Sequence, residues 1–250
     1  MLKRIATLEA APPWGLFAGI GLLVAMFAAM VIGTTIAQLT LPESPAQPFI
    51  AWIIGGLLTI VVVMVSRQRT DDERAALRLG ASRLPLLIVL LFSIGAAILI
   101  DVIGLGLTGD FWPVPEVMGF FLINEANFLL LPRAVDAFAW IAAGVFLILV
   151  QPVAEELVLR GVLYPALRTN LGAWPGLLMN AAFHMAFHLL TYVTFRMNGF
   201  TPVWYAAVAT FLDAVVIAGV RAYTGSTRAA IVAHIGFGVF AFLKALAISG

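Results

Sequence analysis

Two adjacent glutamates and a nearby arginine have the spacing for acid–base chemistry. The run EELVLR places Glu155 beside Glu156, with Arg160 four residues after Glu156. In a helix, Glu156 and Arg160 share a face while Glu155 points about a quarter turn away. One carboxylate can then be neutralised by the guanidinium while the other stays free to accept a proton from water. The alternative is that both acids lie in the lipid headgroup region, paired with Arg160 and Arg168.

All three histidines of the chain also lie in apolar runs. His184 and His188, in NAAFHMAFHLL, are four residues apart and share one face of a helix. Such a pair can hold a metal ion, or it can place one imidazole over a water molecule while the other braces it. Hydrogen bonding between helices is the alternative interpretation. His234, in AAIVAHIGFG, has no local partner, so its partner must come from another helix.

Two aspartates are further candidates. Asp213, in ATFLDAVVIAG, could orient a histidine as a hydrogen-bond acceptor. Asp101 is expected near the outer interface, where a structural role suffices. Ionisable groups inside a membrane are costly, about 2.5–3.5 kcal/mol each on insertion scales, so they are functional candidates by default.

The composition of the chain indicates the elements that must position these groups. Of its 250 residues, 62% are hydrophobic and only 11% are charged, which excludes an ordinary soluble domain. The 14 basic and 13 acidic residues nearly balance, so the protein has no strong positive electrostatic field that would attract nucleic acid. The absence of cysteine excludes disulfides, thiol nucleophiles and cysteine-bound metal.

Seven apolar runs are long enough to cross a bilayer, which takes about 20 residues in a helix. The sequence therefore predicts an all-α polytopic transmembrane bundle of about seven spans, forming one integral membrane domain over residues 1–250. The fourth run is too long for one simple crossing, and we expect it to continue beyond Glu156 as a turn or a kinked extension. The predicted spans are Trp14–Thr40, Pro48–Ser66, Leu84–Thr108, Val135–Arg168, Trp174–Phe195, Phe200–Tyr223 and Ser226–Leu246.

The basic residues predict the orientation of these spans. With a cytoplasmic N-terminus, eleven of the fourteen lysines and arginines fall on the cytoplasmic side, leaving Arg133, Arg196 and Lys244 opposite. We expect residues 67–83 to form an amphipathic segment at the cytoplasmic interface and residues 109–133 to form an extracytoplasmic cap. The expected location is the plasma membrane of a bacterium or archaeon.

Three elements stand in a fixed order along the chain: EELVLRGVLYPAL, NAAFHMAFHLL and TGSTRAAIVAHIGFG. This order resembles the CPBP family of intramembrane proteases, which includes the type II CAAX prenyl endopeptidases and bacteriocin-processing relatives. The resemblance covers a catalytic core of about residues 140–242. It implies that Glu155 and His188 activate the attacking water, that Glu156 and Arg160 shape the site, and that His234 stabilises the oxyanion.

The chain departs from the pattern of that family at two positions. The second motif of the family is Phe-x-x-x-His, and aligned on His188 this chain has His184 where the Phe belongs. The third motif is His-x-x-x-Asn or Asp, and the fourth residue after His234 is Gly238. Losing one oxyanion donor costs about 10²–10³ in rate elsewhere, so Gly238 raises the question of whether proteolysis survives.

The cofactor is either none or zinc. Glu155, His184, His188 and His234 could form a three-histidine, one-carboxylate shell around a metal that lowers the pKa of bound water. The metal-free route instead makes the glutamate the base, with His188 sharing the proton, and we favour this route.

Three hypotheses for the function follow. The leading one is an intramembrane endopeptidase that hydrolyses a prenylated tail or a small membrane peptide at a site walled by the four C-terminal helices. The second is a catalytically silent scaffold or accessory subunit of a larger membrane complex, motivated by Gly238. The third, ion transport through Asp101, Asp213 and the histidines, lacks the inverted repeat that transporters often show.

Overall fold

The described part of the chain is entirely helical. The computed structural model describes residues 2–111, 137–192 and 199–249, and no strand occurs among them. Six of the helical segments in these ranges are long and apolar enough to cross a membrane, namely Leu16–Thr40, Gln47–Ser66, Leu86–Thr108, Ala137–Leu171, Phe200–Thr224 and Thr227–Ala247. The predicted all-α polytopic bundle is therefore confirmed.

Each of the seven predicted runs corresponds to a helical segment. The fifth forms α11, Ala173–Thr191, which is not among the six because Asn180 and two histidines reduce its hydropathy. A seventh crossing and the cytoplasmic N-terminus thus stay predictions. The predicted cap at residues 109–133 lies almost entirely outside the described residues.

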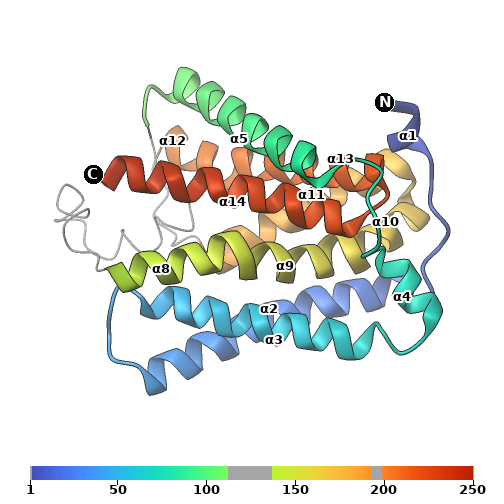
Figure 1. Ribbon diagram of the computed structural model, residues 1–250, viewed down its shortest axis with the longest axis horizontal. Helices are drawn as coiled ribbons and strands as arrows, with labels where there is room; N and C mark the ends of the chain where they lie inside the picture. Colours follow the sequence, from blue (N-terminus) through green and yellow to red (C-terminus); the bar gives the residue numbers. More distant parts are fainter. Residues whose placement is uncertain (1, 112–136, 193–198, 250) are drawn as a thin grey trace.

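The helices pack side by side around one long central element (Figure 1). Helices α2 (Leu16–Thr40) and α3 (Gln47–Ser66) pair on one side of it. Their backbones approach closely because Gly33 of α2 has no side chain, and a Cβ there would collide with the carbonyl oxygen of Ala51. On the other side, α14 (Thr227–Ser249) packs between the central element and α5 (Leu86–Thr108). Helix α11 packs against the end of the central element and against α13 (Thr210–Thr224).

The central element is one helix of 35 residues, Ala137–Leu171, with two π-helical stretches. It consists of α8 (Ala137–Val145), η2 (Phe146–Val150), α9 (Gln151–Glu156), η3 (Leu157–Leu163) and α10 (Tyr164–Leu171). The predicted extension beyond Glu156 is therefore a continuous helix and not a turn. The π-helical stretches flank the segment that carries both glutamates, a placement common at functional sites.

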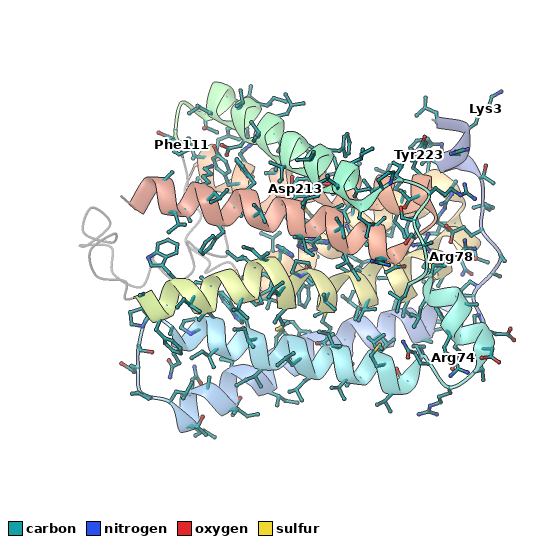
Figure 2. All side chains as sticks on the ribbon, viewed as in Figure 1. Lys3, Arg74, Arg78, Phe111, Asp213 and Tyr223 are labelled. Carbon is teal, nitrogen blue, oxygen red and sulfur yellow. The ribbon has the colours of Figure 1, made fainter. Side chains whose placement is uncertain are left out.

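The short helix α4, Asp71–Leu77, forms within the predicted segment 67–83. It begins with a capping box in which the Thr70 hydroxyl and the Glu73 carboxylate each accept a backbone N–H of the other residue. The Leu77 side chain is fully buried against the bundle, while the acidic first turn is exposed. Helix α4 thus packs against one end of the bundle, where Figure 2 labels Arg74 and Arg78.

The N-terminal segment closes this same end through buried arginines. Both guanidinium nitrogens of Arg221 donate to the Glu9 carboxylate, at 2.6 and 3.0 Å, and Arg78 Nε lies 3.2 Å from it. Arg168 donates to the backbone oxygens of Ile5 and Thr7. Burial alone raises the pKa of the Glu9 carboxyl, but Arg221 and Arg78 hold that pKa below its usual value. We call Glu9, Arg78, Arg168 and Arg221 the end network.

Candidate active site

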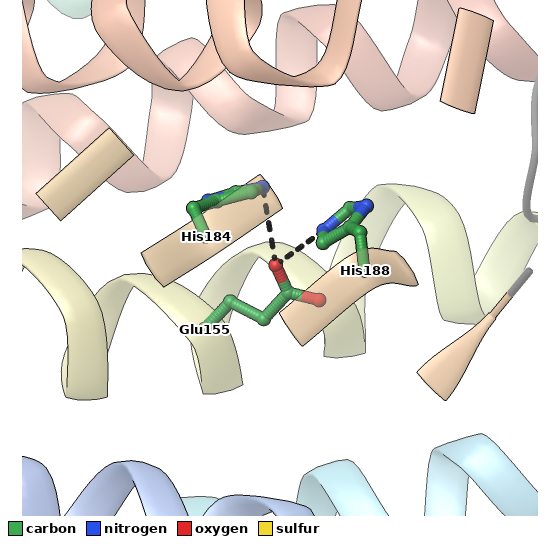
Figure 3. Close-up of side chains that lie close together, drawn as sticks. All are labelled: Glu155, His184 and His188. Atoms are coloured by element: carbon green, nitrogen blue, oxygen red, sulfur yellow. Dashed lines mark hydrogen bonds and ion pairs between the residues drawn. The ribbon is translucent and has the colours of Figure 1, made fainter. Parts of the chain in front are cut away.

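Glu155 is held by side chains from one face of α11. Its Oε2 atom lies 2.9 Å from His188 Nε2 and 3.6 Å from His184 Nε2. Its Oε1 atom accepts a hydrogen bond from the Tyr192 hydroxyl at 2.9 Å. Figure 3 shows both imidazoles directed at the same oxygen. The three partners are spaced four residues apart, so two turns of α11 and the residue that directly follows the helix, Tyr192, present them to α9.

Glu156 belongs to a second group of contacts around Arg160. Glu156 Oε1 accepts hydrogen bonds from Arg160 Nη1 at 3.0 Å and from His234 Nδ1 at 2.9 Å. Arg160 Nη1 also contacts His184 Nδ1 at 2.6 Å, and its Nη2 donates to the backbone oxygen of Ala214 at 2.9 Å. The partner that His234 needed from another helix is therefore Glu156. Arg160 links the two groups, because His184 contacts both Arg160 and Glu155.

All six of these groups are buried. Glu155, Glu156 and Arg160 have no exposed surface, and the histidines are at most 5% exposed. The alternative that both acids lie among headgroups and pair with Arg168 does not match this arrangement. Glu155 is also not a free carboxylate, because α11 supplies hydrogen-bond donors to both of its oxygens. We call Glu155, Glu156, Arg160, His184, His188 and His234 the site network.

A cavity of about 80 Å³ adjoins the site network, which is room for several water molecules. All three histidines line it, together with residues of α5, η2, α9, α13 and α14 and of η4 (Trp204–Ala209). The predicted cavity walls were the four C-terminal helices, and the structure adds α5 through Ala97 and Asp101. From the histidines, the lining residues continue toward the end of the bundle where α5 and α14 finish, away from α4 (Figure 1).

Sequence reasoning missed two polar residues of this site. Tyr192 donates to Glu155, and Gln151 lines the cavity one helical turn before Glu155. Gln151 is 3% exposed, and its Nε2 has no hydrogen-bond partner among the described residues. Both could have been found by the four-residue spacing, because Gln151 precedes Glu155 by four positions and Tyr192 follows His188 by four.

The two aspartates line the far part of the cavity. Asp213 faces it from α13, within the same lining as the histidines. Asp101 pairs with Lys244 of α14, whose ammonium group also lies 4.4 Å from the centre of the Tyr205 ring. The pairing keeps both charges of a buried cation and anion compensated.

Gly238 lines the cavity because α14 and η2 approach each other closely there. A Cβ on Gly238 would collide with the carbonyl oxygen of Leu147. A side chain at this position therefore requires the two helices to separate. The departure from the family pattern at Gly238 is thus a packing feature as well as a missing amide.

Glu155, His184 and His188 have the residue types of a metal site, with ligand atoms within 4.8 Å of one another. Their hydrogen bonds do not fit one. A guanidinium group only donates, so His184 Nδ1 accepts from Arg160 and the proton of the neutral ring sits on Nε2. His188 Nε2 donates to Glu155 Oε2 when that carboxylate is ionised, because an ionised carboxylate only accepts. In this arrangement the His184 nitrogen that faces Glu155 carries a proton, and the buried guanidinium group of Arg160 lies next to the same ring.

The family comparison agrees with the position of the site network. Residues 137–240 match the model of the family described as "Type II CAAX prenyl endopeptidase Rce1-like". This range contains both glutamates, Arg160 and all three histidines. No curated protein and no solved structure matches the chain significantly.

The match and the long apolar helices together define the class of the protein. It is an integral membrane protein, with several helices able to span a bilayer. Over residues 137–240, the chain matches the Rce1-like family model, and this match supports a likeness to the CAAX-type intramembrane proteases.

Proposed function

We propose that the protein is an intramembrane endopeptidase that hydrolyses a peptide bond in a prenylated tail or a small membrane peptide. The observation that carries the proposal is the buried Glu155 carboxylate, held by His188 and Tyr192 beside a cavity with room for water. A carboxylate in this setting can act as general base, and the neighbouring imidazole can share the proton.

The reaction balances without a cofactor. Glu155 accepts one proton from a cavity water as the water oxygen bonds to the peptide carbonyl carbon, and the carbonyl electron pair moves to its oxygen. This pair then re-forms the double bond as the C–N bond breaks. The departing amine takes the proton held by Glu155. His188 is hydrogen-bonded to the same carboxylate during this transfer. The products are a carboxylic acid and an amine.

Glu156 and Arg160 act by positioning. Glu156 holds the His234 ring through Nδ1, and Arg160 holds both Glu156 and the His184 ring. Because these groups are buried and mutually bonded, the imidazoles are fixed before substrate arrives. Preorganised dipoles need no reorganisation during the reaction.

The test is turnover of a defined peptide by protein in lipid nanodiscs. The substrate is a fluorescence-quenched peptide that ends in S-farnesyl-cysteine followed by two aliphatic residues and serine. Glu155→Gln keeps the shape of the side chain and removes the base, so we expect kcat to fall by about 10²–10⁴. Glu43→Gln, the same change at an exposed position, should turn over like wild type.

Two outcomes contradict the proposal. Equal turnover by wild type and Glu155→Gln removes Glu155 as the base. No turnover by wild type of either the farnesylated peptide or its unprenylated form favours the silent scaffold, and copurification of a stoichiometric protein partner would then support that alternative. Cleavage of the unprenylated peptide at the same rate assigns small membrane peptides rather than prenylated tails as the substrate class.

A further inference from the structure

We propose that His184 donates a hydrogen bond from Nε2 to the oxyanion of the tetrahedral intermediate. This inference rests on the proposed peptidase function and extends it to a residue that the resemblance does not assign. It follows from where the protons of the three imidazoles lie, from the position of His184 at the cavity, and from the packing of Gly238.

The hydrogen bonds of the site network indicate which nitrogen of each imidazole carries the ring proton. His188 directs its Nε2 proton to Glu155, and His234 directs its Nδ1 proton to Glu156. In the neutral form, His234 Nε2 is then a lone pair, so this ring needs a second proton before it can donate to an oxyanion. His184 is the reverse case, because Arg160 occupies Nδ1 and the ring proton stays on Nε2.

The Nε2–H group of His184 is available to a new acceptor. Its nearest carboxylate oxygen is Glu155 Oε2 at 3.6 Å, which is beyond a normal hydrogen bond. The ring lines the cavity, stacks on His188 with a centroid separation of 4.3 Å, and lies 5.5 Å from the His234 ring. An oxygen atom in the cavity at the His184 ring can therefore meet this donor, and Glu155 lies directly behind the His184 and His188 rings that line the cavity.

The packing of Gly238 explains why the donor comes from α11. Gly238 lines the same cavity but cannot carry a side chain without displacing the backbone at Leu147. The close approach of α14 and η2 thus excludes an amide donor from that position. His184 reaches the cavity from another wall, and its imidazole supplies an N–H group there.

Arg160 strengthens this donor. The guanidinium lies 2.6 Å from His184 Nδ1 and polarises the ring, which makes the Nε2–H group a better donor. Negative charge on the oxyanion appears as Glu155 is neutralised by the water proton. The combined charge of the site network and the substrate thus stays constant, while the negative charge moves from Glu155 to the substrate oxygen at the His184 donor.

Two substitutions at position 184 separate donation from support of Arg160. The amide oxygen of Asn overlays Nδ1 of histidine, so His184→Asn keeps the acceptor for Arg160 and loses the donor. The amide nitrogen of Gln overlays Nε2, so His184→Gln keeps the donor and loses that acceptor. With the farnesylated peptide in nanodiscs, we expect His184→Asn to lower kcat about 10²–10³ with KM nearly unchanged. His184→Gln should recover most of this loss, to within about tenfold of wild type.

A second measurement tests the same variants and does not require turnover. A phosphinate analogue of the same peptide mimics the tetrahedral anion, and its affinity should fall in His184→Asn by a factor similar to that in kcat/KM. Thermal melting of each variant shows whether it is folded. This readout separates a lost donor from a lost fold.

Each remaining outcome overturns the inference. Wild-type kcat in His184→Asn with a loss in His184→Gln assigns His184 to the support of Arg160 alone. Equal loss in both variants with unchanged phosphinate affinity removes the donor role. In either case the proposed peptidase function stands, because its test is the activity of the Glu155→Gln variant. Wild-type protein without turnover overturns both proposals.

Discussion

The site network and the end network both bury charged side chains, but they differ in what those charges can do. In the end network, the two oxygens of Glu9 accept from Arg221, and Arg168 donates to backbone oxygens. Arginine stays charged at all relevant pH values, so no proton moves in this network near neutrality. None of its members lines the cavity.

The site network combines carboxylates with three imidazoles, a group that offers one nitrogen as donor and the other as acceptor. It also adjoins the cavity through all three histidines. Among the described residues, the carboxylate oxygen that faces the N–H group of His184 is Glu155 Oε2 at 3.6 Å, beyond a normal hydrogen bond. The comparison teaches that buried charge alone indicates a structural role, whereas buried carboxylates and imidazoles beside a water-sized cavity indicate chemistry. Four changes test this difference.

Arg160→Gln should have the largest effect on the fold. It leaves Glu156 buried with His234 as its remaining partner, and breaking a buried pair in this way costs about 3–5 kcal/mol. We expect a strongly lowered melting temperature in detergent and loss of peptidase activity. Arg74→Gln is the control, because its pair with Asp71 is exposed and should leave the melting temperature nearly unchanged. Equal melting of the two variants would show that Arg160 does not hold the site together.

Glu9→Gln should lower stability without lowering the chemical step. The change removes the carboxylate that accepts hydrogen bonds from Nη1 and Nη2 of the buried Arg221. Hydrogen bonds to charged groups are worth about 1.5–3 kcal/mol. We expect a lower melting temperature with kcat close to wild type at a temperature where both are folded. Glu43→Gln supplies the baseline for an exposed glutamate. A large fall in kcat would mean that the end network takes part in the reaction.

The stabilising effect of Glu9 should depend on pH in a defined direction. Its folded-state pKa lies below the ordinary value of 4.5, so the unfolded state binds more protons and stability rises with pH through this range. The contribution is complete above pH 4.5 and is lost as the pH falls through the lowered folded pKa. The melting difference between wild type and Glu9→Gln should therefore shrink from about pH 7 to about pH 3. A difference that grows on acidification contradicts this sign.

Chelation should have the smallest effect. Because the imidazole nitrogens facing Glu155 carry protons, we expect dialysis against a strong chelator to leave kcat within about twofold of its starting value. Zinc added in excess should inhibit, since binding to His184 or His188 would displace a proton. Loss of activity on chelation and recovery with stoichiometric zinc would instead assign a metal centre to Glu155, His184 and His188.

The helical architecture could be predicted from the sequence because backbone groups in lipid must be satisfied within each segment. Long apolar runs then have one stable form, and each predicted run matches a helix to within a few residues at the ends described. The sequence also placed Glu156 and Arg160 on one face, because i and i+4 neighbours are a local property of the helix.

Contacts between distant segments were beyond the sequence. Only tertiary packing brings His234 to Glu156, Arg160 to His184, and Glu9 to Arg221. The spacing of residues within one helix holds no information on how separate helices are rotated or how deeply they lie. The closeness of α14 and η2, which makes Gly238 a packing residue, is set by interhelical approach. The sequence therefore determined which groups could react and in which kind of element they lie. The packing of the bundle decided which nitrogen each histidine presents to the cavity.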